Sequence, residues 1–98
     1  MTNDLAVTLL QTTLASKKPE ENYNRISGLL ENAPLCDVII LPEKFSTGFS
    51  MEPDGVAERH DPDGMSTIEL MKALSASLSA AVTGSVLFED GGRHFNRM

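Results

Sequence analysis

The sequence predicts one α/β domain in which short strands alternate with helices in the order strand, helix, strand, helix, strand, strand. Three observations lead to this prediction. Short apolar runs alternate with segments of helical periodicity, a proline and two acidic residues mark the start of the first such segment, and the most apolar run is continuous. At 98 residues the chain is long enough for a single small domain with a modest core.

The first strand and the first helix are predicted from residues 5–34. Residues 5–11 are largely apolar and are closed by polar residues, which is typical of a strand. Pro19 suits the first turn of a helix, and the two glutamates after it complement the helix dipole. Residues 32–34 end this helix. Its predicted buried face consists of Tyr23, Ile26, Leu29 and Leu30.

The second strand is predicted at Val38–Leu41. Its continuous apolar character is typical of a strand covered on both faces, and a strand, a helix and a strand in this order form a right-handed unit with parallel strands. Residues 45–62 contain two glycines and two prolines and are predicted to be a long loop. Loops of that length in a small domain are usually functional.

The remaining elements are a helix and two strands. The helix is predicted to begin at Asp63 or Gly64, and a strand is predicted at residues 81–88. Residues 89–92, Glu-Asp-Gly-Gly, have the composition of a hairpin turn and lead into a last strand at 93–98. The predicted apolar face of the helix consists of Ile68, Met71, Leu74 and Leu78.

Composition and charge exclude several function classes. Fourteen acidic and eight basic residues give a net charge of −6, which disfavours a nucleic-acid partner. The apolar runs are far shorter than the roughly 20 residues of a membrane span. The N-terminal segment has the acidic Asp4 where a signal peptide would have basic residues, so we expect a cytoplasmic protein. The lone Cys36 excludes an intrachain disulfide, and the two separated histidines predict no metal site.

The candidate site is Glu43, which follows the most apolar strand and Pro42. Ligands of parallel sheets gather beyond the carboxyl ends of the strands. A carboxylate there is expected to be partly desolvated, which disfavours its charged form and favours a role as general base. The alternative is that Glu43 is a solvated loop residue or caps a backbone group.

Three segments in the same order resemble the nitrilase superfamily, the carbon-nitrogen hydrolases. Residues 41–51, "LPEKFSTGFSM", resemble its first catalytic motif, in which Pro-Glu is followed by an aromatic residue and then Gly-Phe. Residues 5–26 are similar to its first strand and helix, with Gln11 closing the strand and Asn22 or Asn24 in the helix. Residues 82–98 resemble its Gly-Ser strand, hairpin and Asn-Arg pair. The ending "TGFSM" is most similar to the ω-amidase-like branch.

The resemblance implies an αββα sandwich with a catalytic glutamate, lysine and cysteine that hydrolyses amides or nitriles without a cofactor. Glu43 matches the glutamate, which takes the proton from the thiol and later from water. The family's lysine and cysteine lie further along than Met98. Residues 1–98 are therefore expected to be the N-terminal portion of a longer enzyme that acts on a small carboxylate-bearing amide. Alone they are expected to be inactive.

Several nearby residues need separate interpretation. Lys44 occupies a position where the family usually has an apolar residue, and a cation beside Glu43 would weaken it as a base; we do not assign it as the oxyanion lysine. Cys36 precedes the strand, at the end opposite to Glu43, so we interpret it as structural. Phe45, Phe49 and Met51 either line the substrate pocket or serve packing. Asn96 and Arg97 are interpreted as mainly structural, near the site.

A second hypothesis is a flavodoxin-like α/β module that binds a ligand or partner at the same strand ends without catalysis. It explains the order of elements and an acidic residue after a strand, but it does not explain Pro42-Glu43 together with Gly48-Phe49. If part of a sandwich is missing, an uncovered sheet is expected to self-associate, so a homo-oligomer is also predicted.

Overall fold

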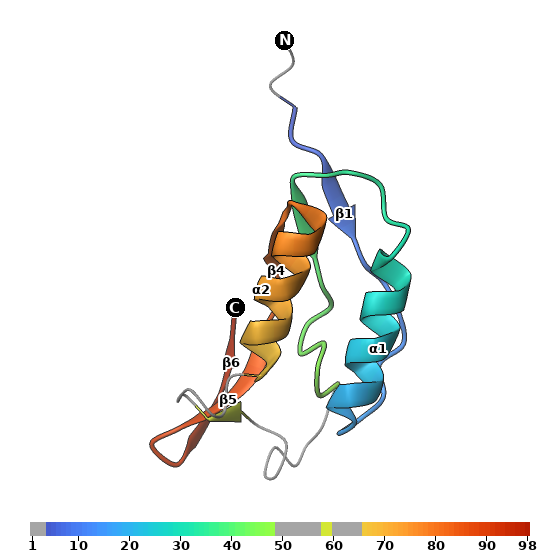
Figure 1. Cartoon of the computed structure of the whole chain (residues 1–98). Helices are drawn as coiled ribbons and strands as arrows, with labels where there is room; N and C mark the ends of the chain where they lie inside the picture. Colours follow the sequence, from blue (N-terminus) through green and yellow to red (C-terminus); the bar gives the residue numbers. More distant parts are fainter. Residues whose placement is uncertain (1–3, 49–57, 60–65) are drawn as a thin grey trace.

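The computed structural model describes residues 4–48, 58–59 and 66–98. In these ranges the chain forms two helices and six short strands (Figure 1). Their bounds are β1 Val7–Leu9, α1 Pro19–Leu30, β2 Val38–Ile40, β3 Glu58–Arg59, α2 Ser66–Leu78, β4 Ala81–Thr83, β5 Val86–Asp90 and β6 Arg93–Arg97. The chain is α/β, as predicted.

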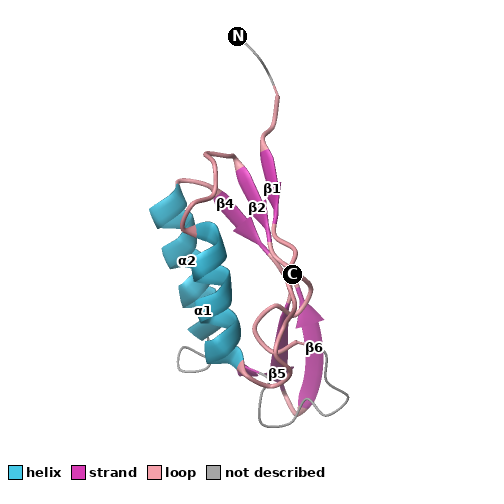
Figure 2. Cartoon of the chain, turned by 90° about the vertical axis from the view of Figure 1, so that its right-hand side faces the viewer, coloured by secondary structure: helices cyan, strands magenta, loops and turns pink. Residues whose placement is uncertain are grey.

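The first sheet is parallel and has the order β1-β2-β4. Thr8, Ile39 and Val82 are in register and share one face, because side chains alternate along each strand. Ile39 is buried in the same core cluster as Ile26 and Leu30 of α1. Both helices lie on this side of the sheet (Figure 2). The predicted parallel unit is therefore confirmed.

The other face of this sheet is open within the described residues. Leu9 is 72% exposed, and Val38 and Ile40 of β2 are only half-buried. The expectation that the β2 run is covered on both faces is therefore wrong for this part of the chain, since both helices pack on the same side (Figure 2).

Neither described helix is long and apolar enough to cross a membrane.

The first helix begins where its sequence predicts, and both helices pack largely as predicted. Pro19 stands in the first turn of α1, and Ile26 and Leu30 are buried. Leu29 is 52% exposed, which corrects its assignment to the buried face. The whole predicted face of α2 packs against the core. The predicted start of this helix at Asp63 or Gly64 lies outside the described residues.

The second sheet has the order β3-β5-β6, and β5 and β6 form an antiparallel hairpin. Gly91 and Gly92 have φ angles of 60° and 78°, which suit a two-residue hairpin turn and confirm the turn prediction. β3 lies inside residues 45–62, so the long loop contains a short strand. A short strand of two residues carries too little pattern to be predicted from the sequence.

The predicted strand at 81–88 is divided into β4 and β5 by Gly84 and Ser85. A Cβ on Gly84 would lie 3.0 Å from the ring of Phe45 and 3.1 Å from the Cβ of Leu41. Glycine therefore permits the close approach of the chain that follows β2. The break directs β5 out of the first sheet, and Figure 2 shows the hairpin extending beyond it.

Asn22 joins α1 to the segment that carries Glu43. Its side chain is 1% exposed. Its Oδ1 accepts a hydrogen bond from the Ala15 N–H at 2.7 Å, and its Nδ2 donates to the carbonyls of Ala15 and Ser46, both at 2.8 Å. The residue thus holds the turn after β2 against the start of the helix.

We expect Asn22→Ala to lower the free energy of unfolding by about 2 kcal/mol, because three backbone groups lose their partner in a largely buried place. Urea unfolding measures the difference. Asn24→Ala on the same helix is the matched control, since Asn24 is exposed and its replacement is expected to change stability by no more than about 0.5 kcal/mol. Equal effects of both substitutions would contradict the linking role of Asn22.

Candidate functional site

Glu43 lies just past the carboxyl end of β2. The Leu41 N–H still donates to the Thr83 carbonyl at 2.8 Å, but Pro42 has no N–H to continue the ladder. The chain turns at residues 43–47, and the Gly48 N–H closes the turn on the Lys44 carbonyl at 2.8 Å. The strand thus ends where the sequence predicts, with the glutamate at the mouth of the sheet.

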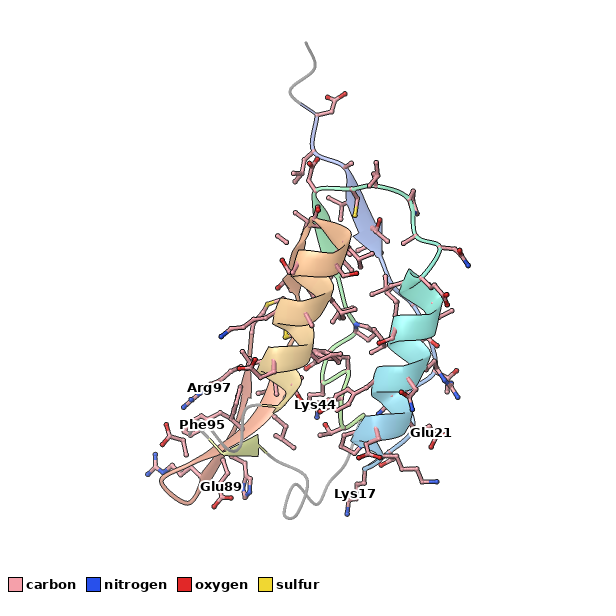
Figure 3. All side chains as sticks on the ribbon, in the orientation of Figure 1. Lys17, Glu21, Lys44, Glu89, Phe95 and Arg97 are labelled. Atoms are coloured by element: carbon pink, nitrogen blue, oxygen red, sulfur yellow. The ribbon has the colours of Figure 1, made fainter. Side chains whose placement is uncertain are left out.

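The backbone directly after Glu43 has an unusual conformation. Lys44 has a φ of 48°, in the left-handed region that non-glycine residues rarely adopt. Its N–H donates to Ser85 Oγ at 2.9 Å, so the break between β4 and β5 holds this turn from the other side. Figure 3 shows the position of Lys44 in the turn. The left-handed residue changes the chain direction and leaves Glu43 at the outside of the bend.

The carboxylate of Glu43 has a partner on the second sheet. Asn96 Nδ2 donates to Glu43 Oε1 at 2.7 Å. Asn96 is on β6, opposite Leu87 of β5. The hydrogen bond joins residues 53 positions apart and connects the end of the first sheet to the hairpin.

A pocket of about 400 Å³ opens beside this pair of side chains. Its lining residues are Leu41, Glu43, Ser85, Asn96 and Met98. A cavity of that size can hold a small molecule, and the walls combine apolar groups with a carboxylate, a hydroxyl and an amide. The arrangement can accept a proton from a group placed in the pocket.

Glu43 is exposed in the part of the chain that the structure describes. The expected partial desolvation of its carboxylate is therefore not present there, since the carboxylate lies at the pocket rim rather than inside the sheet. What distinguishes the group is its fixed position and its hydrogen bond.

Phe45 does not line this pocket. Its side chain is fully buried in the hydrophobic core, with 0% exposure, and it packs against the backbone of Gly84. Of the two roles left open for Phe45, pocket lining and packing, the structure shows packing, because the turn at Lys44 sends the ring into the core. Phe49 and Met51 lie outside the described residues.

Neither Cys36 nor Arg97 lines the pocket beside Glu43. Cys36 precedes β2, packs against the core and is separated from Glu43 by the length of the strand. Arg97 forms an ion pair with Asp90 at 3.1 Å and stacks over the ring of Phe95 at 4.6 Å (Figure 3). Neighbouring residues on a strand face opposite ways, so the Asn-Arg pair supplies one residue to the site and one to the hairpin.

The sequence predicted Asn96 near the site but not its contact with Glu43, and it gave no site role to Ser85. Their contact with the turn depends on the break at Gly84, whereas the sequence analysis predicted one strand at 81–88. The Gly-Ser pair inside a strand pattern was the available signal, because an isolated glycine in a strand indicates a bulge or a close backbone approach.

The known proteins that match this chain are similar to it over most of its length. No protein-family model matches the chain. It is 34% identical over 93 residues to omega-amidase YafV of Yersinia enterocolitica, and 31% identical over 93 residues to omega-amidase YafV of Escherichia coli strain K12. These matches cover 95% of this chain and 35% of each relative.

A solved structure shows the same relationship. XC1258 from Xanthomonas campestris, described as a CN-hydrolase superfamily protein with an arsenic adduct in the active site, is 35% identical and superposes with a TM-score of 0.84. The match covers 97% of this chain and 35% of that one. The chain thus spans about a third of the length of these relatives, and they favour the hydrolase hypothesis over the flavodoxin-like module.

Proposed function

Because its sequence and fold relate the chain to the carbon-nitrogen hydrolase (nitrilase) superfamily, we propose that it is the part of an omega-amidase-like amidase that carries the general base. The observation that carries this proposal is the position of Glu43. Its carboxylate stands at the carboxyl end of a parallel strand, lines a pocket, and is held by a residue of another sheet. We propose that residues 1–98 are the N-terminal portion of the domain.

In the proposed reaction, Glu43 takes the proton of a cysteine thiol supplied by the rest of the longer chain. The thiolate attacks the amide carbonyl, a lysine stabilises the oxyanion, and the C–N bond breaks as the proton passes to the leaving ammonia. Glu43 then takes a proton from the water that hydrolyses the thioester, which releases the acid and restores the thiol. In each step the carboxylate of Glu43 only carries one proton and forms no covalent bond to the substrate.

The proposed substrate is the amide of a small carboxylate-bearing compound, which follows from the named activity of the relatives. The described pocket lining contains an anion and no cation. A group that pairs with the substrate carboxylate must therefore come from residues other than these five. We therefore propose that the reacting amide, and not the substrate carboxylate, lies beside Glu43, because two carboxylates in contact repel each other.

We expect the purified 98-residue chain to release no ammonia from ω-amides of dicarboxylic acids, whereas the longer protein that contains it releases ammonia from them. An enzyme-coupled ammonia assay measures both. The control substrate is a simple aliphatic amide without a carboxylate, for which the longer protein is expected to be a much poorer catalyst. Ammonia release by the 98-residue chain that disappears in Glu43→Gln would contradict the proposed division of the site. Binding without turnover by the longer protein would support the non-catalytic module.

A further inference from the structure

We propose that Asn96 is a positioning residue for the general base, and that it directs the transferred proton to Oε2 of Glu43. The inference rests on the proposed function, which makes Glu43 the base. It goes further by naming the residue that orients this carboxylate and the oxygen that reacts.

The side chain of Glu43 needs a contact with another residue to keep one orientation. It is exposed, and an exposed glutamate side chain rotates about three bonds. The hydrogen bond of 2.7 Å from Asn96 Nδ2 fixes Oε1 and therefore the plane of the carboxylate. Correct orientation of a catalytic group supplies a large part of the rate of an enzyme.

This hydrogen bond gives the two carboxylate oxygens of Glu43 different roles. The Asn96 NH₂ group can only donate, and a charged carboxylate can only accept. Oε1 is thus engaged, while Oε2 accepts no hydrogen bond from the residues that the structure describes. A proton that arrives at Oε2 leaves the bond to Oε1 intact, so Asn96 holds Glu43 in both protonation states.

The residues that hold Glu43 and the turn after it belong to the β5-β6 hairpin or directly precede it. Ser85, just before β5, holds the N–H of Lys44, and Asn96 on β6 holds the carboxylate of Glu43. β5 and β6 are paired along their whole length, and the ion pair between Arg97 and Asp90 braces the hairpin next to Asn96. Backbone and side chain of the base are therefore positioned by one rigid unit.

The kinetic test uses Asn96→Ala and Asn96→Asp in the longer protein. We expect Asn96→Ala to lower kcat by about 10- to 100-fold with KM changed by less than about twofold, because the base loses its orientation while the other four residues of the pocket lining are unchanged. Asn96→Asp keeps the shape but puts a second carboxylate against the first, so its kcat is expected to fall at least as far. Asn24→Ala, an exposed asparagine on α1, is the control with unchanged kcat and KM.

A second measurement needs no catalysis. In the 98-residue chain, NMR follows the side-chain NH₂ resonances of the asparagines on Glu43→Gln substitution, and we expect those of Asn96 to shift while those of Asn24 stay in place. Unmoved Asn96 resonances, or full kcat in Asn96→Ala when Glu43→Gln abolishes activity, would overturn the inference and leave the proposed function intact. Hydrolysis that survives Glu43→Gln would overturn both.

Discussion

Glu43→Gln is expected to lower kcat for amide hydrolysis by the longer protein by about 10²- to 10⁴-fold, the usual contribution of a general base. The substitution keeps the size of the side chain and its place at the pocket rim. Glutamine Oε1 can still accept the hydrogen bond that Asn96 now donates at 2.7 Å. Only the ability to take a proton is removed, so the loss is expected in kcat while KM changes little.

Two further measurements separate this chemical loss from a structural one. Glu31→Gln, an exposed glutamate at the end of α1, is the matched control, and it is expected to keep the full rate. Thermal unfolding of both variants is expected to agree with the unsubstituted protein, because an exposed side chain contributes little to stability. A Glu43→Gln protein with at least a third of the original kcat would remove Glu43 from the proposed catalytic role.

The first sheet and the hairpin of the second sheet were predictable because their elements carry local signals. Pro19 marks the start of α1, Pro42 prevents the ladder of β2 from continuing, and Gly91-Gly92 supplies the two positive φ angles of the hairpin turn. Each signal lies within a few residues of the feature that it determines. The location of Glu43 at the end of β2 follows from them directly.

The contacts of the site could not be predicted in the same way. Asn96 reaches Glu43 after the chain leaves the first sheet at Gly84, where the ring of Phe45 lies against the glycine. Residues 81–88 look like one uninterrupted strand in sequence. A non-local packing contact therefore decides which polar residues meet at the pocket.

Phe45 shows why residue type alone left two roles open. An aromatic side chain two positions after a candidate base suits a substrate pocket as well as a core. The left-handed conformation of Lys44, with a φ of 48°, separates the directions of Glu43 and Phe45. One side chain stays at the surface while the other is buried completely.

We expect Phe45→Ala to lower the free energy of unfolding by about 3–5 kcal/mol, as is typical when a fully buried phenylalanine is truncated. The ring is 0% exposed and lies against Gly84, where glycine has no side chain that could fill the cavity. Domains of this size are stable by only about 5–15 kcal/mol, so the variant is expected to lose a large part of its stability. Urea unfolding followed by circular dichroism measures the change.

The comparison with Phe95 and with a smaller truncation makes the role of the buried ring specific. Phe95 is 37% exposed and stacks with Arg97, so Phe95→Ala is expected to cost about 1 kcal/mol. Phe45→Leu retains most of the apolar volume and is expected to cost clearly less than Phe45→Ala. If Phe45→Ala were as stable as Phe95→Ala, the ring could not be the contact that sets the break at Gly84. In that case the meeting of Asn96 with Glu43 would need another cause.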